Sequence, residues 1–158
     1  MTDHPLAYRA VTQQDFDALA DLRSAAMRAS LERLGRYDPQ RSRERLRASF
    51  DPSLARAIER GGRRIGFYAL RPTDGAWRLD HLYLLPAECG QGVGSQVMRH
   101  IIGQAQAAGQ DLRVGALRGS DSNRFYRRHG FVQVDETEWD IEYLREHRRA
   151  GSPPAPPA

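Results

Sequence analysis

The chain has 158 residues, the size of one domain with room for a single hydrophobic core. Its basic residues are arginines and its formal net charge is +4, so an anionic cofactor, an acidic substrate and nucleic acid are all compatible partners. The single cysteine, Cys89, excludes an internal disulfide and a cysteine-based zinc site, and no apolar run approaches the roughly 18 residues of a membrane span, so we expect a cytoplasmic protein with no metal and no membrane partner.

The first part of the chain is predicted to form a strand and two helices. Leu6 to Val11 is a short strand, and Thr12 caps a helix whose apolar residues recur at helical spacing. A second helix is expected from about Gln40 to Phe50. It is rich in arginine, so we expect it to lie on the surface and to dock through Leu46 and Phe50.

A β-hairpin follows the two helices. Gly61-Gly62 is the two-residue turn between strands at Ala55 to Arg60 and Arg64 to Leu70. A further turn at Pro72 to Gly75 leads into a strand from Trp77 to Leu85. The sheet is therefore expected to be antiparallel up to this point.

The second half of the chain contains a helical crossover. A helix begins at Gly92 and ends at Gly109, and a strand follows at Leu112 to Leu117, which implies parallel pairing with the preceding strand. Ser122 to Arg128 is a short helix. Phe131 to Val134 and Trp139 to Leu144 are the closing strands.

These elements predict an α/β (α+β) fold, in which a mixed, mostly antiparallel sheet of six or seven strands carries helices on both faces. The fold occupies residues 1–145 as one domain, and residues 146–158 form a Pro-rich tail that is expected to be disordered. The closing strand at Trp139 to Leu144 is also a candidate for pairing across a homodimer.

The most informative stretch is the Gly-rich turn that follows the strand ending at Leu85. Cys89-Gly90-Gln91-Gly92-Val93-Gly94-Ser95 places three glycines in five positions where a helix begins. Such a turn leaves backbone N–H groups at the positive end of the helix, a geometry that binds phosphate or pyrophosphate. The turn contains no lysine, so the backbone would hold the anion, and glycine lets a ligand approach the main chain closely.

Two blocks of sequence resemble the GNAT superfamily of acetyl-CoA-dependent N-acetyltransferases. Leu82 to Met98 looks like the family's (Arg/Gln)-x-x-Gly-x-(Gly/Ala) pyrophosphate loop, and Asn123 to Phe131 is similar to its late helix with a Phe-Tyr-x-x-x-Gly-Phe ending. Two positions depart from the pattern. Cys89 stands where the family usually has Arg or Gln, and Gly119 stands where many members place Asn.

The resemblance implies acetyl-CoA as the co-substrate. The main chain of Leu82, Tyr83 and Leu84 would pair with the pantetheine arm, where the family's sheet splays between this strand and the strand of Val114. Asn123 is expected to take a further cofactor contact. The pyrophosphate would be held by the N–H groups of the turn, namely Gly90, Gln91, Gly92, Val93, Gly94 and Ser95.

The resemblance also assigns catalytic roles. Tyr126 occupies the position whose hydroxyl usually protonates the departing thiolate, so it is the expected general acid. The amine must lose a proton before it attacks, and Val114, at the position of the glutamate base of some members, cannot accept it. Asp80, on the same strand face as Leu82, is the preferred base, with His81 on the opposite face or water as the alternatives.

The predicted function is transfer of an acetyl group from acetyl-CoA to a primary amine of a small molecule or peptide, by direct attack in a ternary complex. Arginines between Arg23 and Phe50 would attract an acceptor bearing a carboxylate or phosphate. The alternatives are a non-catalytic acyl-CoA or dinucleotide-binding domain and an arginine-driven nucleic-acid-binding protein. The turn lacks the third glycine of a dinucleotide fingerprint, and no basic helix-turn-helix is apparent, so nucleic acid is not the expected partner.

Overall fold

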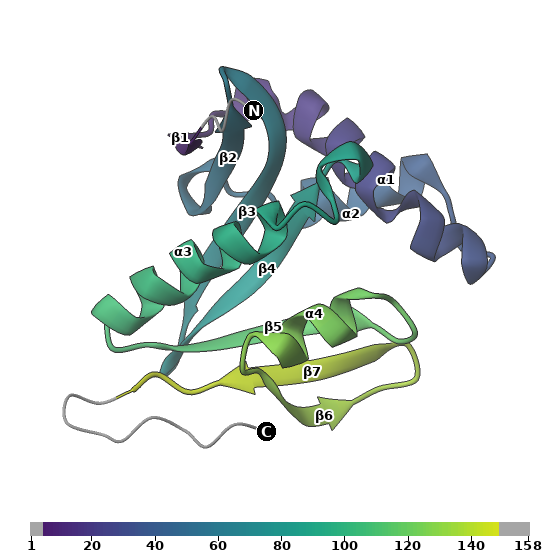
Figure 1. Cartoon of the computed structure of the whole chain (residues 1–158). Helices are drawn as coiled ribbons and strands as arrows, with labels where there is room; N and C mark the ends of the chain where they lie inside the picture. Colours follow the sequence, from purple (N-terminus) through teal and green to yellow (C-terminus); the bar gives the residue numbers. More distant parts are fainter. Residues whose placement is uncertain (1–4, 149–158) are drawn as a thin grey trace. The chain divides into compact units, whose positions relative to one another are not determined.

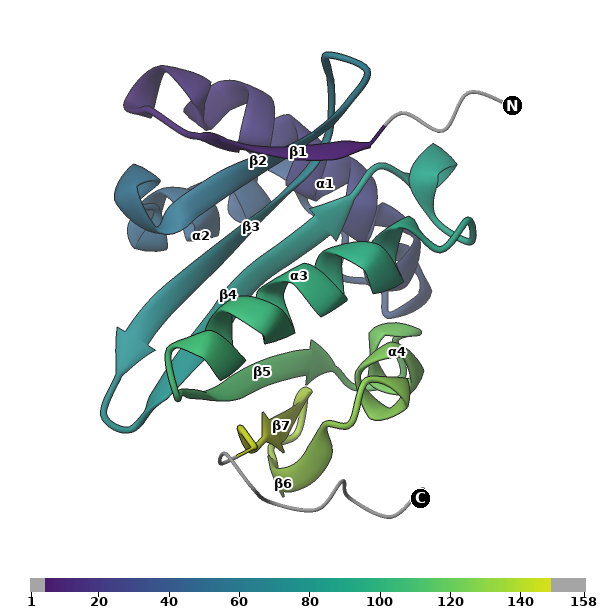
Figure 2. The ribbon, with the colours of Figure 1, turned by 60° about the vertical axis from the view of Figure 1, so that its left-hand side comes forward.

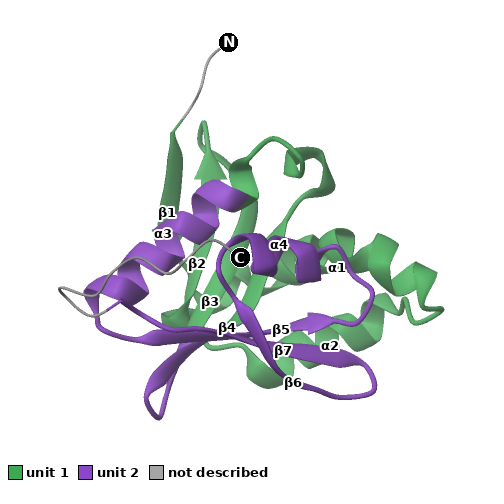
Figure 3. Ribbon diagram, turned by 60° about the horizontal axis from the view of Figure 1, so that its bottom comes forward, with its two compact units in different colours: residues 1–70, 80–94 green, residues 71–79, 95–158 purple. Residues whose placement is uncertain are grey.

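The computed structural model describes residues 5–148, which fall into two compact units (Figure 3). The first unit contains the residues up to Leu70 together with Asp80–Gly94. The second contains Arg71–Leu79 and the residues from Ser95 onward. The prediction of one domain over residues 1–145 stays a prediction.

The strands form a seven-stranded mixed sheet in the order β1-β2-β3-β4-β5-β7-β6, as expected for the predicted fold class (Figure 1). The strands are β1 (Leu6–Ala10), β2 (Ala55–Arg60), β3 (Arg63–Thr73), β4 (Ala76–Leu84), β5 (Asp111–Leu117), β6 (Val132–Glu136) and β7 (Asp140–Arg145). The helices are α1 (Phe16–Arg33), α2 (Pro39–Ser49), α3 (Val93–Ala107) and α4 (Ser122–Arg128), with 3-10 turns η1 (Gln13–Asp15), η2 (Pro52–Leu54) and η3 (Pro86–Glu88).

The pairing directions follow the sequence expectations. β1 and β2 pair antiparallel, as do β2 and β3, and β4 pairs with β5 in parallel across the α3 crossover. β7 is antiparallel to both β5 and β6. A doubly wound dinucleotide-binding domain has a mostly parallel sheet, so this pairing argues against that alternative.

The first unit has its own apolar core between α1, α2 and the strands β2 and β3. Leu46 is the fully buried residue of α2, and the Phe50 ring lies 5.4 Å from that of Phe16, so α2 docks through the two residues predicted. At the start of the preceding helical segment, the Thr12 N–H donates to the Asp15 carboxylate at 2.9 Å. This capping interaction explains why the helical segment starts there.

The second unit buries one face of α3 and alternate residues of β5. Val97, Met98 and Ile101 recur at helical spacing and are fully enclosed, as are Leu112 and Val114 at the two-residue spacing of a strand. The short helix α4 lies at the end of β5 (Figure 2) and has the bounds predicted for it.

The β3 strand extends beyond its predicted end at Leu70 and includes Pro72, which the sequence analysis placed in a turn. Proline lacks the N–H that a strand ladder uses. The ladder of β3 with β2 ends at the pair of Ala69 and Ala55, because β2 begins there. Pro72 therefore lies past this ladder, where its missing N–H removes no bond to β2.

The prediction that the strand at Trp139 to Leu144 pairs across a homodimer is wrong. β7 is hydrogen-bonded to β5 on one side and to β6 on the other, so both of its edges are already used within the chain. The start of the predicted tail is also held. The His147 N–H donates to Asp111 at 2.9 Å, and the Arg148 N–H donates to Gln106 at 2.7 Å. Residues 149–158 of that tail lie outside the described residues.

Within residues 5–148, no helix has the length and apolar character needed to cross a bilayer. In the same part of the chain, no three His, Cys, Asp or Glu side chains gather as metal ligands.

Candidate functional site

The Gly-rich turn connects η3 to α3 in the first unit. Gly90 (φ +83°) and Gly92 (φ +79°) adopt left-handed backbone conformations that residues with a side chain rarely take. A Cβ atom at either position would meet no other atom within 4 Å. α3 begins at Val93, and the first N–H groups of a helix have no carbonyl within it to donate to. The turn therefore places helix-start donors beside open space.

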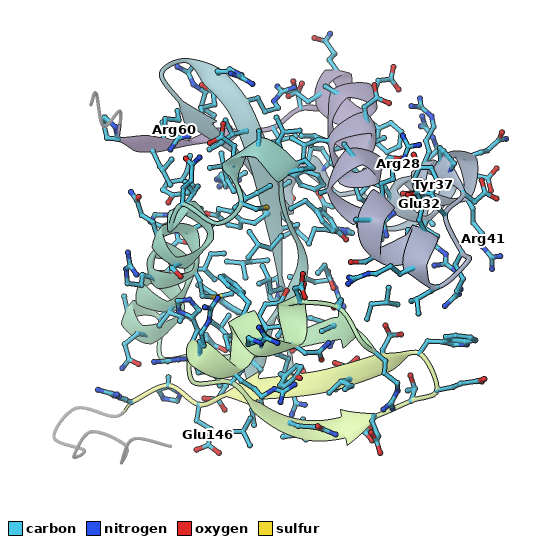
Figure 4. The ribbon with its side chains drawn as sticks, turned by 45° about the vertical axis from the view of Figure 1, so that its right-hand side comes forward. Arg28, Glu32, Tyr37, Arg41, Arg60 and Glu146 are labelled. Atoms are coloured by element: carbon cyan, nitrogen blue, oxygen red, sulfur yellow. The ribbon has the colours of Figure 1, made fainter. Side chains whose placement is uncertain are left out.

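Neighbouring residues hold this turn in place. The buried Glu88 carboxylate pairs with Arg60, and the Leu85 N–H donates to the Ile65 carbonyl at 2.8 Å. Arg60 is labelled in Figure 4 and ends β2. Partial burial, and secondarily the Glu88 carboxylate, raise the pKa of the Cys89 thiol. Cys89 is thus a protonated thiol at neutral pH, which does not suit a nucleophile.

The end of β4 is fixed by a close approach to β3 at Gly66. A Cβ atom at this glycine would lie 2.3 Å from the Tyr83 carbonyl oxygen and 2.7 Å from Leu84 Cδ2. Only glycine leaves room for this approach, and it positions the main chain of Leu82–Leu84, the predicted pantetheine-binding residues. The ladder between β4 and β5 pairs Ala76–Leu79 with Asp111–Val114, four of the nine β4 residues.

The two side-chain candidates for the general base, Asp80 and His81, are consecutive residues of β4, so strand alternation places them on opposite faces. The His81 ring packs against Phe67 and Tyr83, with centroids 5.9 and 5.7 Å away. Burial, and then the charge of Arg23, lower the pKa of His81 to about 4, although Asp80 acts in the opposite direction. Its Nε2 atom is enclosed and has no hydrogen-bond partner in the described chain. These surroundings make His81 a weaker base than an ordinary imidazole, and the choice of Asp80 as the base stays a prediction.

Arg23 of α1 is a site residue that the sequence analysis did not single out. Its Nε donates to the Tyr83 hydroxyl at 3.2 Å, and its Nη1 donates to the Ser42 carbonyl at 3.1 Å and to the Ser42 hydroxyl. Arg23 as a whole is only 9% exposed, and its Cζ atom lies 5.5 Å from the centre of the Tyr83 ring. One signal was available, since the spacing of Phe16, Leu19 and Arg23 places the arginine on the apolar stripe of α1.

In the second unit, Tyr126 lies on α4 and is 7% exposed. Its ring packs against Phe131 and Tyr143, with centroids 5.6 and 6.0 Å away. The aromatic packing fixes the direction of the side chain, as a positioned acid requires. It is equally what a structural tyrosine would show, so the catalytic role of Tyr126 stays a prediction.

Asn123 is buried one turn before Tyr126, and its amide is engaged within the protein. The Nδ2 group donates to the carbonyls of Leu117 at 2.9 Å and Ser120 at 3.0 Å, and Oδ1 accepts from the Tyr143 hydroxyl at 2.8 Å. These bonds tie the loop between β5 and α4 to β7. The cofactor contact predicted for Asn123 stays a prediction, and its observed role is to hold this loop.

Ser95, in the first turn of α3, has a partner that was not predicted. Its hydroxyl lies 3.0 Å from His129 Nε2. Burial, followed by the charges of Arg128, Arg99 and Arg145, lowers the pKa of His129. The imidazole is therefore neutral at physiological pH, and Ser95 lies next to a cluster of arginines in the second unit.

The structure thus brings Asp80, Leu82–Leu84 and Gly90–Gly94 together in the first unit, and Ser95, Asn123 and Tyr126 in the second. Chemically, the first group offers a backbone cradle for an anion and a carboxylate that can take up a proton. The second group offers a phenol that can give up a proton.

Solved structures with the same fold include acetyltransferases. The PaiA N-acetyltransferase of Thermoplasma acidophilum in complex with coenzyme A is 16% identical over 90% of this chain and 99% of that chain, with a TM-score of 0.75. An acetyltransferase from Thermus thermophilus is 19% identical over 92% of this chain and 99% of that chain, with a TM-score of 0.71. N-acetylglutamate synthase of Neisseria gonorrhoeae, complexed with coenzyme A and N-acetyl-glutamate, is 20% identical over 94% of this chain and 36% of that chain, with a TM-score of 0.67.

No curated protein sequence matches the chain. The family model described as "Acetyltransferase (GNAT) domain" matches residues 54–133, which is half of the chain and includes the glycine turn and α4. The chain therefore belongs to the GNAT acetyltransferase family.

Proposed function

We propose that this protein is an N-acetyltransferase that moves an acetyl group from acetyl-CoA to a primary amine of a small molecule or peptide. The observation that carries the proposal is the turn at Gly90 and Gly92, whose left-handed glycines leave open space beside the start of α3. It lies inside the segment that matches the acetyltransferase family.

The turn suits the diphosphate of coenzyme A because no bulk blocks an approach to its main chain. The N–H groups of Gly90–Ser95 would donate to the phosphate oxygens, and the α3 dipole would favour the negative charge. The main chain of Leu82–Leu84 would pair with the amides of the pantetheine arm. The Thermoplasma acidophilum and Neisseria gonorrhoeae neighbours were both solved with coenzyme A, which supports the same ligand here.

In the proposed reaction, the amine nitrogen attacks the carbonyl carbon of the thioester in a ternary complex. A C–N bond forms, the C–S bond breaks, the sulfur leaves with the electron pair, and the nitrogen gives up a second proton to solvent to leave a neutral amide. Tyr126 gives its hydroxyl proton to the sulfur and recovers one from solvent. A phenol and a thiol have reference pKa values of about 10 and 8.5, so this transfer needs little adjustment.

An ammonium has no lone pair, so the acceptor must lose a proton first. We assign this step to the Asp80 carboxylate, acting through water molecules, because side-chain alternation along β4 places Asp80 on the strand face opposite to His81. The alternative base, His81, has an enclosed Nε2 and a pKa lowered to about 4, so it holds a proton less well than an ordinary imidazole.

A thiol-detection assay with acetyl-CoA and a panel of amines tests the proposal. Free coenzyme A should appear only when an acceptor is supplied. Tyr126→Phe should lower kcat by roughly 100-fold or more while the acetyl-CoA Kd from calorimetry stays within about twofold. Tyr8→Phe, which removes a hydroxyl from β1, is the control and should behave like the parent. If Tyr126→Phe turns over as fast as the parent, the acid assignment is wrong, and if acetyl-CoA does not bind, the proposed function is wrong.

A further inference from the structure

Arg23 differs in both burial and pairing from the arginines of the first unit that form ion pairs. Arg28, Arg60 and Arg64 each form an ion pair with an acid, and all three are more exposed than Arg23. Arg23 is the most buried of them, yet within residues 5–148 none of the groups to which it donates a hydrogen bond is a carboxylate.

A buried guanidinium without a counter-charge is unfavourable, because its neutral hydrogen-bond partners only partly replace water. Ser42 and Tyr83 occupy Nη1 and Nε, and Nη2 has no hydrogen-bond partner in the part of the chain that the structure describes. One positive charge and one donor nitrogen are therefore left for a group that is not part of this chain.

The neighbouring side chains also present donors. The Tyr83 hydroxyl accepts from Arg23 Nε, so its own hydrogen is free to point at His81 Nδ1, 3.4 Å away. When Nδ1 of the neutral His81 ring accepts a hydrogen bond, the ring hydrogen is on Nε2. This Nε2 atom is enclosed and has no partner among the described residues. The cluster of Arg23, Tyr83 and His81 is thus short of acceptors and carries a net positive charge.

We propose that Arg23 binds a carboxylate of the amine acceptor, so that the enzyme acetylates amines that also carry an acid, as amino acids do. This inference rests on the proposed acetyltransferase function and names the substrate class of the same site. A carboxylate fits better than a phosphate, because a single unpaired charge matches one negative charge and would leave a phosphate dianion half compensated.

Each standard amino acid, paired with its carboxamide, tests the proposal in the thiol-release assay. Loss of a hydrogen bond to a charged group costs about 1.5–3 kcal/mol, so the parent should use the preferred acid roughly 10- to 100-fold better than its amide in kcat/KM. Intrinsic reactivity favours the amide, because its amine is less basic and less protonated at neutral pH. A preference for the acid would therefore come from the protein.

Arg23→Gln should bring the acid-to-amide ratio close to one while the acetyl-CoA Kd stays at the parental value. Arg23→Lys keeps the charge without the planar fork, should give an intermediate ratio, and replaces Arg23→Gln if circular dichroism shows that variant unfolded. Arg9→Gln is the matched control. It removes the same charge from the first unit at an exposed residue that is paired with Glu59 and lies outside the segment expected to attract the acceptor, so it should leave the ratio unchanged.

The outcomes separate this inference from the proposed function. Equal use of acids and amides by the parent, or faster use of O-phosphoethanolamine than of any amino acid, overturns the carboxylate assignment and leaves the acetyltransferase in place. If no amine is acetylated, the proposed function fails, and calorimetry with the amino acids then decides about Arg23. If the parent binds an amino acid and the Arg23→Gln variant does not, the carboxylate site is supported. If both proteins bind amino acids equally well, or neither binds them, the carboxylate site is overturned.

Discussion

Gly66→Ala tests the idea that β4 owes its position to a close contact with β3. The added Cβ would lie 2.3 Å from the Tyr83 carbonyl oxygen, and real Cβ contacts essentially never fall below 3.0 Å, so the strands must separate by at least 0.7 Å at this point. The obstacle is backbone, which cannot rotate away as a side chain can.

Overpacking of this kind typically costs about 1–3 kcal/mol, and replacing glycine by alanine returns about 0.4–1 kcal/mol by restricting the unfolded chain. We therefore expect Gly66→Ala to lower the free energy of unfolding by about 1–2 kcal/mol, which corresponds to a Tm lower by roughly 2–8 °C. Because Tyr83 and Leu84 must move, acetyl-CoA should also bind more weakly.

Gly103→Ala is the matched control, because a Cβ there would meet nothing within 4 Å and Gly103 lies in the middle of α3. Alanine is the better helix former, so this variant should gain about 0.5–1 kcal/mol. Urea unfolding and thermal melts of both variants give the comparison. A Gly66→Ala protein as stable as the parent, with unchanged acetyl-CoA affinity, would show that the approach of β4 to β3 is not the constraint inferred here.

Two further changes test the surroundings of the site. Asn123→Ala should lower the free energy of unfolding in urea by about 2–4 kcal/mol, since it leaves the buried Tyr143 hydroxyl and the Leu117 carbonyl without their partner. Adding Tyr143→Phe to this variant should recover about 1 kcal/mol. Strict additivity of the two changes would contradict the hydrogen bond between Asn123 and Tyr143. In the folded protein the pKa of His81 is about 4, below the ordinary 6.5, so between these pH values the unfolded chain binds a proton that the folded protein does not. The neutral His81 therefore makes its full contribution to the free energy of unfolding above pH 6.5, and about 3 kcal/mol of that free energy is lost as the pH falls to 4. The stability difference between the parent and His81→Gln should therefore shrink over that range, and a difference independent of pH would exclude a neutral, buried imidazole.

The predictions that succeeded depend on residues close together in the sequence. The bounds of α4 and the docking of α2 through Leu46 and Phe50 follow from helical spacing, and the position of Gly92 at the start of α3 follows from turn chemistry. The predicted end of the β3 strand was wrong because it depends on where the neighbouring strand β2 begins. Pro72 is tolerated within β3 because β2 has no residue opposite it, and no local signal reports where a partner strand begins.

The distinction between local and long-range sequence signals also separates cofactor binding from acceptor binding in the proposed reaction. The proposed cofactor cradle is a short segment in which glycine provides both the backbone conformation and the open space, so its sequence signal is local. The cluster around Arg23 joins α1 to β4 across 60 positions of sequence, and it exists only because one arginine lies on the apolar stripe of α1. Under the proposed function, membership of the acetyltransferase family predicts that an acetyl group is delivered from acetyl-CoA, whereas the choice of acceptor would depend on which side chains α1 and α2 bring to β4. For this reason substitutions at Arg23 should change which amines react while substitutions in the glycine turn change whether acetyl-CoA binds at all.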